Sequence, residues 1–290
     1  MSTKLIIDQT YPKSTLPLWK LISFICLVTI SMISMAMDKD IYLADQKDIF
    51  LITNKALQTI PNIVWLNITY LGDALILIPL ISFVSIINTR IWAAMFGAIP
   101  LAFSLSHLGK NFFAIPRPAA VLDSQQFHII GERLTAFTSF PSGHTITIFA
   151  AASAILFVVL AKRKNSPNAQ IRSFGIILIL AVATIVGISR VAVGAHWPAD
   201  VVFGAVLGVI SGMSGEYLSR RYIKWWSWMN DYPVYLSVFI FMFSFILIVC
   251  SVNGLVHSLF VTWLAIAVGA TTGTYITLKS ILLNENRNPL

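Results

Sequence analysis

Three short segments of this sequence contain the residues that could do chemistry. They are Lys110-Asn-Phe-Phe-Ala-Ile-Pro-Arg117-Pro118, then Pro141-Ser142-Gly143-His144, then the stretch from Ser189-Arg190 through His196 to Asp200. Together they hold three cations, two histidines and one carboxylate. This set matches phosphoryl chemistry better than any packing requirement, because fixed cations stabilise phosphate oxygens while a histidine can move protons or attack as a nucleophile.

The first segment suits the binding of an oxyanion. Pro116 and Pro118 flank Arg117 and disfavour helix there, so the guanidinium is presented from an extended segment. Arginine offers a rigid fork that matches phosphate oxygens, and Lys110 acts as a compact point charge. Either cation alone is better explained as an interfacial residue of a membrane protein. The first segment therefore indicates an anion site only in combination with the other two.

The second segment directly precedes a long apolar stretch. Ser142 is a candidate N-cap for a helix there, and Gly143 lets a ligand approach the backbone closely. The start of that helix would offer free N–H groups and a positive dipole end to an anion. His144 would stand beside the anion as a titratable acid. A plain helix cap with an interfacial histidine is the structural alternative.

The third segment pairs a histidine with a carboxylate. His196 and Asp200 are four residues apart, which places them on one face if a helix begins near Trp197 with Pro198 in its first turn. A carboxylate that holds one imidazole nitrogen fixes the tautomer and leaves the other nitrogen as an oriented base or nucleophile. Arg190 adds a further cation. Each segment has a structural explanation in isolation, but the three together favour a reactive site.

The composition defines the elements that must position these segments. The chain of 290 residues is 57% hydrophobic and 11% charged, with a mean hydropathy of +0.80, whereas soluble domains carry roughly 25% charged residues. A soluble enzyme, a disordered chain and a disulfide scaffold are therefore excluded. Stretches of about 20 apolar residues predict eight membrane spans, near residues 21–37, 62–87, 91–108, 145–161, 174–189, 197–217, 234–252 and 256–278. The fold class is all-α, a polytopic helical membrane protein, with residues 1–290 as a single integral membrane domain.

The distribution of basic residues predicts the orientation. The connections on the N-terminal side of the membrane carry 13 of the 20 Lys and Arg residues, and those on the opposite side carry 7. The positive-inside rule then places both termini in the cytoplasm and the three segments at the outer face. Most of the net charge of +8 thus orients the protein, so it does not indicate nucleic acid as a partner.

No known metal or nucleotide motif accompanies the three segments. The sequence has no zinc-type Cys/His spacing, H-E-x-x-H, P-loop, G-x-S-x-G or dinucleotide-binding fingerprint. We therefore expect metal-independent chemistry without a cofactor, in which the fixed cations take the place of magnesium.

The three segments together resemble the tripartite signature of the type 2 phosphatidic acid phosphatase (PAP2) superfamily. Residue types and spacings match in all three blocks, from Lys110 to Asp200. The resemblance to the membrane branch of the family implies a six-helix core at about residues 60–218. Two further C-terminal spans, at about 230–280, lie outside that core and carry no chemical motif.

The resemblance also implies a role for each site residue. In the family, the histidine at His196 is the nucleophile and forms a phosphohistidine, the aspartate at Asp200 orients it, and the histidine at His144 protonates the leaving alkoxide. The residues that hold the phosphate oxygens are those at Lys110, Arg117, Ser142, Gly143 and Arg190. Family members need no divalent metal.

These observations predict an integral membrane phosphatase that hydrolyses a lipid phosphomonoester or diphosphate at the outer face of the cytoplasmic (inner) membrane. Candidate substrates are undecaprenyl diphosphate, phosphatidylglycerophosphate, phosphatidic acid and a lipid A phosphate. A lipid phosphotransferase with the same intermediate is the first alternative, and an anion or lipid transporter and an inactive lipid-binding relative are others. Partners are membrane lipids, with no nucleic acid.

Three features outside the signature also give expectations. Asp73 lies inside the second predicted span, where we expect it to hydrogen-bond a neighbouring helix. The acidic cluster at residues 38–48 predicts a solvated or interfacial amphipathic segment. His128, with Asp123, Glu132 and Arg133, either shapes the entrance for a head group or lies at the surface.

Overall fold

The computed structural model describes residues 36–160 and 169–285, together with single positions between 23 and 34. Within these residues the secondary structure is helical, without β-strands. The longer helices are α2 (Lys39–Leu57), α3 (Asn62–Tyr70), α6 (Thr89–Phe113), α8 (Gly143–Leu160), α9 (Ala169–Ala192), α10 (Pro198–Arg221), α12 (Pro233–Val252) and α13 (Phe260–Glu285). The shorter ones are α4 (Ala74–Leu80), α5 (Val84–Ile87), α7 (Pro118–Val121), the 3-10 turn η1 (Ile223–Trp226) and α11 (Trp228–Asp231).

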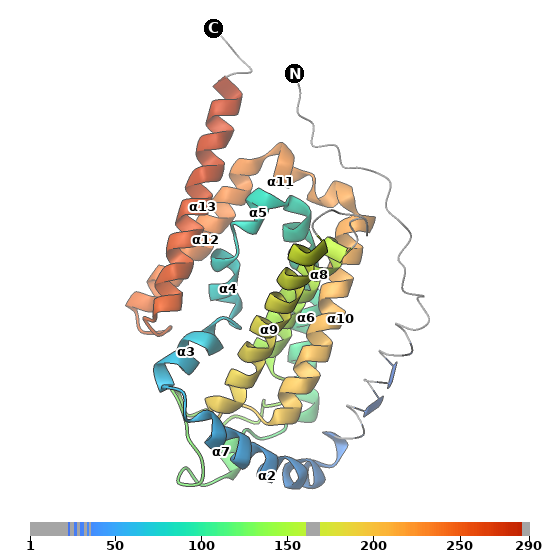
Figure 1. Ribbon diagram of the computed structural model, residues 1–290, viewed down its shortest axis with the longest axis vertical. Helices are drawn as coiled ribbons and strands as arrows, with labels where there is room; N and C mark the ends of the chain where they lie inside the picture. The colour runs from blue at the N-terminus through green and yellow to red at the C-terminus, as the bar shows by residue number, and fades with distance from the viewer. Residues whose placement is uncertain are drawn as a thin grey trace.

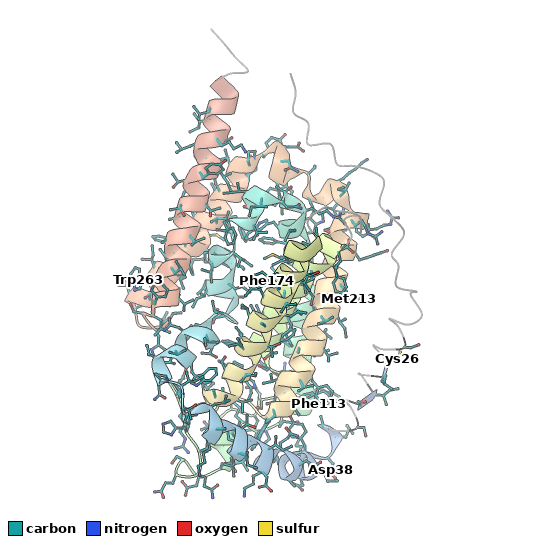
Figure 2. The ribbon with its side chains drawn as sticks, in the orientation of Figure 1. Cys26, Asp38, Phe113, Phe174, Met213 and Trp263 are labelled. Carbon is teal, nitrogen blue, oxygen red and sulfur yellow. The ribbon has the colours of Figure 1, made fainter. Side chains whose placement is uncertain are left out.

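Six helices in the described part of the chain are long and apolar enough to cross a membrane, and they confirm six of the predicted spans. These helices are α6, α8, α9, α10, α12 and α13. These helices present large apolar side chains outward, as lipid contact requires: Phe174 on α9 is 69% exposed and Trp263 on α13 is 47% exposed (Figure 2). The predicted first span, at 21–37, lies largely outside the described residues.

The predicted span at 62–87 is not one straight helix. The chain bends by 77° between α3 and α4, and α5 follows as a separate short helix. Gly72 and Asp73 occupy the bend, and the Asp73 carboxylate accepts a hydrogen bond from the Leu75 N–H at 2.8 Å. Asp73 is therefore the N-cap of α4. Its carboxylate binds the backbone of α4 itself, whereas a hydrogen bond to a neighbouring helix was expected. Hydropathy summed over the whole stretch cannot reveal a break of this kind, because the residues on both sides remain apolar.

The core of the molecule is a bundle of α6, α8, α9 and α10 (Figure 1). α8 and α10 approach closely because α10 presents a row of glycines, Gly204, Gly208 and Gly212, to α8. A Cβ atom built on Gly212 would lie 2.6 Å from the carbonyl oxygen of Ala150 and from the Cβ of Ser153. Small residues spaced by four let membrane helices pack backbone against backbone.

Because α8 and α10 are in close contact, a single methyl group added between them should lower the stability of the protein substantially. Gly212→Ala should lower the free energy of unfolding by about 1 to 3 kcal/mol, because the added Cβ must push two backbones apart. Gly175→Ala on α9 is the matched control, because a Cβ there meets no atom within 4 Å. The measurement is the denaturation midpoint in detergent. Equal midpoints for the two variants would contradict the proposed packing.

The C-terminal helices α12 and α13 form a hairpin that packs on α4, beside the core bundle (Figure 1). Gly269 and Gly273 line the contact surface of α13. A Cβ on Gly273 would lie 2.9 Å from the ring of Phe241 on α12, and one on Gly269 would lie 2.9 Å from Pro79 on α4. The two spans beyond the signature are thus joined to the bent segment that precedes α6.

Helix α2 crosses the end of the bundle at which α6 ends and at which α8 and α10 begin (Figure 1). Asp38 caps it, and its acidic residues Asp40, Asp45 and Asp48 are exposed, as predicted for a solvated segment. Its buried face consists of residues spaced by four, Tyr42, Gln46, Phe50 and Asn54. Three of these four side chains are polar, so this face can bind groups at the end of the bundle.

Candidate active site

The three signature segments meet at the end of the bundle that α2 covers. The Ser142 N–H, just before α8, donates to the Asp200 carbonyl oxygen at 3.1 Å, so the starts of α8 and α10 are joined directly. Arg117, just before α7, donates through Nη1 to the Ala195 carbonyl oxygen at 3.0 Å and lies 3.5 Å from Nε2 of His196. The expectation that these segments lie close together is confirmed.

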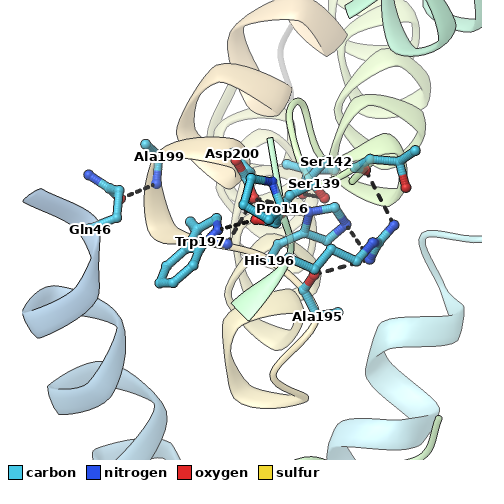
Figure 3. Close-up of polar contacts among 12 residues, drawn as sticks. Gln46, Pro116, Ser139, Ser142, Ala195, His196, Trp197, Ala199 and Asp200 are labelled. Atoms are coloured by element: carbon cyan, nitrogen blue, oxygen red, sulfur yellow. Dashed lines mark hydrogen bonds and ion pairs between the residues drawn. The ribbon is translucent and has the colours of Figure 1, made fainter. Parts of the chain in front are cut away.

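His196 and Asp200 form the predicted pair. α10 begins at Pro198 with Trp197 as its N-cap, which places Nδ1 of His196 3.2 Å from Oδ2 of Asp200 (Figure 3). Both side chains are buried, with 1% and 0% exposure. Because Nδ1 faces the carboxylate, Nε2 is left toward Arg117 as the reactive nitrogen.

The surroundings of His196 keep its imidazole neutral. Burial lowers the pKa of His196 well below its usual value, and the nearby charges of Arg117 and Arg190 lower it further. A neutral imidazole has a free lone pair on Nε2 at physiological pH. The site therefore holds His196 in the form that a nucleophile requires.

The cations around His196 have unused donors. Arg117 and Arg190 are only 9% and 6% exposed, and the buried Nε of each has no hydrogen-bond partner among the described residues. A buried charged donor without a partner is costly, so such donors point to an anionic ligand. Lys110 Nζ lies 3.3 Å from the position of a Cβ on Gly143, which places this ammonium beside the start of α8. Lys110 thus lies at the start of α8, whereas Arg117 lies beside Nε2 of His196.

The bend between α3 and α4 forms another wall of the site. Thr69 accepts a hydrogen bond from Nη1 of Arg190 through its hydroxyl. A Cβ on Gly72 would lie 2.8 Å from the Cβ of His144, so only glycine leaves His144 its place. The predicted N-cap, Ser142, directly precedes α8, and its hydroxyl accepts from the Thr145 hydroxyl at 2.9 Å.

The charged residues of the connection between α7 and α8 lie at the surface. The side chains of His128, Glu132 and Arg133 are exposed, and the His128 backbone is held by the Asn54 side chain of α2. Asp123, with Lys47 and Gln126 among others, lines a cavity of about 400 Å³ between α2 and this connection.

Sequence reasoning missed three residues that hold the signature residues. The Tyr42 hydroxyl donates to Oδ1 of Asp200 at 2.6 Å, and the Ser139 hydroxyl donates to Oδ2 at the same distance. Thr69, as described, holds Arg190. Ser139 lies two residues before Pro141, so a wider second block would have included it. Tyr42 and Thr69 have no local signal, because they are distant from the signature along the chain.

Comparison with known proteins agrees with this geometry. Residues 91–221, which contain all three signature segments, match the model of the PAP2 superfamily. This match confirms the resemblance that the residue types and spacings of the signature predicted, over the part of the chain that contains the three segments.

Two relatives carry names that specify a reaction. Over 85 residues the chain is 39% identical to the lipid A 1-phosphatase of Porphyromonas gingivalis. This match covers 29% of this chain and 17% of that protein. Over 121 residues it is 33% identical to the lipid A 1-phosphatase of Rhizobium etli. This match covers 41% of this chain and 46% of that protein. The matches thus span less than half the length of these relatives.

A solved structure shares the fold. The chain is similar to a transmembrane PAP2-type phosphatidylglycerolphosphate phosphatase from Bacillus subtilis, with a TM-score of 0.52 at 22% identity, over 68% of this chain and 96% of that one. This similarity supports the all-helical membrane fold.

Proposed function

We propose that this protein is a membrane lipid phosphatase that transfers the phosphoryl group of its substrate to His196 and then to water. This proposal rests on two buried cations with unused donors, Arg117 and Arg190, in the site of a histidine that Asp200 orients; Nη1 of Arg117 lies 3.5 Å from Nε2 of this histidine. A phosphoryl transition state is stabilised by buried hydrogen-bond donors that lie next to the nucleophile and bind the phosphate oxygens.

In the proposed first step, Nε2 of His196 attacks phosphorus and the bond between phosphorus and the lipid oxygen breaks. His144 donates a proton to the departing oxygen, so the lipid leaves as an alcohol, or as a monophosphate when the substrate is a diphosphate. The guanidinium groups of Arg117 and Arg190 and the ammonium of Lys110 hold the phosphate oxygens while charge redistributes.

In the second step, water attacks phosphorus and the bond to Nε2 breaks. His144, now unprotonated, accepts the proton of the water, which restores the starting state of both histidines. Inorganic phosphate is released, so the reaction is balanced with water as the second reactant. We place this site at the outer face of the inner membrane, with both termini in the cytoplasm, on the basis of the distribution of Lys and Arg.

We propose a lipid A 1-phosphate as the first substrate to test, because both curated relatives are named for that reaction. Undecaprenyl diphosphate, phosphatidylglycerophosphate and phosphatidic acid present the same phosphate chemistry to the site. A site at the end of a helix bundle suits all four, since the acyl or prenyl chains can stay in the bilayer while the phosphate enters.

The test is phosphate release by the full chain in detergent, with EDTA present, for each of these four lipids. We expect release from at least one lipid without a divalent metal, and the order of kcat/KM values identifies the substrate class. Disappearance of the lipid phosphate together with labelling of an added lipid alcohol, but without free phosphate, would identify a phosphotransferase instead. No turnover of any of the four lipids would overturn the proposal and favour a transporter or an inactive lipid-binding relative.

A further inference from the structure

We propose that Tyr42 of helix α2 and Ser139 are positioning residues for the reactive histidine, which they orient by holding both oxygens of the Asp200 carboxylate. This inference rests on the proposed function and goes beyond the signature, which contains neither residue. The two hydroxyl groups come from segments far from Asp200 along the chain, and both are buried.

The carboxylate of Asp200 accepts four hydrogen bonds from the described residues. Oδ2 accepts from the Ser139 hydroxyl at 2.6 Å, from the Trp197 N–H at 2.8 Å and from Nδ1 of His196 at 3.2 Å (Figure 3). Oδ1 accepts from the Tyr42 hydroxyl at 2.6 Å. The bond to His196 is the longest of the four. The three shorter bonds therefore set the orientation of the Asp200 carboxylate, and the carboxylate in turn orients the imidazole of His196.

The hydroxyl of Tyr42 is a permanent donor. Burial raises the pKa of Tyr42 well above its usual value, and the charge of Asp200 raises it further, so this side chain stays protonated at physiological pH. The hydrogen bond from Tyr42 is the one that reaches Oδ1 of Asp200. Loss of this bond would let the carboxylate rotate and move Oδ2 away from Nδ1 of His196.

Helix α2 has other attachments that do not involve the carboxylate. Gln46 Oε1 accepts from the Ala199 N–H at 2.8 Å, and Phe50 contacts Trp197 with ring centroids 5.2 Å apart. Asn54 donates to the carbonyl oxygens of Val191 and Ala192. Removing only the Tyr42 hydroxyl should thus leave α2 in place, because its ring contact with Phe140 does not need the oxygen.

Gln46 provides a matched control for this reason. It lies one helical turn after Tyr42 on the same buried face, and it binds the backbone of α10 next to Asp200 without touching the carboxylate. If α2 only anchors the end of the bundle, Gln46→Met and Tyr42→Phe should have equal effects. If Tyr42 acts through Asp200, only Tyr42→Phe should slow the chemical step.

The experiment compares Tyr42→Phe, Ser139→Ala and Gln46→Met in the full chain, with kcat, KM and the thermal midpoint measured for each. We expect a roughly tenfold loss of kcat for each of the first two, with KM unchanged, since each removes one hydrogen bond to a charged group. Gln46→Met should retain the kcat of the parent. Wild-type kcat in Tyr42→Phe, or losses in all three variants that follow their thermal midpoints, would overturn the inference.

A second readout separates this inference from the proposed function. With ¹⁵N-labelled histidine, the ring nitrogen resonances of His196 report the bond from Nδ1 to Asp200 without any substrate, and the spectrum of His196→Asn assigns them. We expect these resonances to shift in Tyr42→Phe and to stay unchanged in Gln46→Met. If the parent protein hydrolyses no lipid and the shift is still seen, the positioning role holds and the phosphatase proposal fails. If the shift is absent, the positioning role fails whatever the activity.

Discussion

Replacing His196 with asparagine should lower phosphate release from the preferred lipid by on the order of 10⁴-fold or more, since the substitution removes the imidazole nitrogen that attacks phosphorus in the proposed mechanism. Asparagine keeps a polar group beside Arg117 and Asp200, so the buried charges retain a partner and the fold is expected to survive. The measurement is steady-state release of inorganic phosphate by the full chain in detergent.

A covalent label distinguishes loss of the nucleophile from loss of folding. Rapid quenching of the parent enzyme with substrate carrying ³²P should trap an acid-labile, alkali-stable phosphoprotein, as expected for phosphohistidine, and His196→Asn should show none. His128→Asn is the control, because this exposed histidine lies in the connection that α2 holds by its backbone. A label that persists in His196→Asn would assign the nucleophile to another residue.

The second large effect concerns His144, and it should depend on the leaving group. His144→Gln is expected to lower kcat for a lipid phosphate by about 10²- to 10⁴-fold, because an alkoxide is a poor leaving group without a proton donor. With p-nitrophenyl phosphate the loss should be much smaller, since p-nitrophenolate leaves readily without a proton. The ratio of the two losses measures proton donation itself.

The control for this comparison is His107→Gln on α6. His107 is exposed and stacks on Phe103 with ring centroids 5.2 Å apart, so its replacement changes a histidine without changing the site. Equal losses of His144→Gln with both substrates would show that His144 binds or positions the phosphate and does not act as the acid.

Stability and chemistry share one contact surface in this molecule. The glycine row of α10 that lets α8 approach also begins beside the site, where a Cβ on Gly204 would lie 2.9 Å from the Ser142 carbonyl oxygen. The same close approach allows the bond between the Ser142 N–H and the Asp200 carbonyl oxygen. The spacing of these two helices therefore sets the distance between the second and third signature segments.

Much of the site was predictable from the sequence because its geometry is local. The four-residue spacing of His196 and Asp200, with Pro198 between them, requires only one turn of helix to bring the two side chains together. The apolar stretches likewise predict six of the spans now described, because crossing a bilayer demands about 20 apolar residues whatever the neighbours. Between the second and third segments the chain is predicted to cross the membrane twice, so both segments were expected at the same face.

The fold class, the three segments that meet and the cations near His196 could thus be predicted from the sequence, because each depends on composition or on short spacing. The bend in the 62–87 stretch, the bond between Thr69 and Arg190, and the bond between Tyr42 and the carboxylate of Asp200 became visible only in the folded molecule. Tyr42 and Asp200 are 158 residues apart, and no pattern in the chain specifies that pair. Such contacts arise from the packing of α2 across the end of the bundle, and packing is a property of the whole fold.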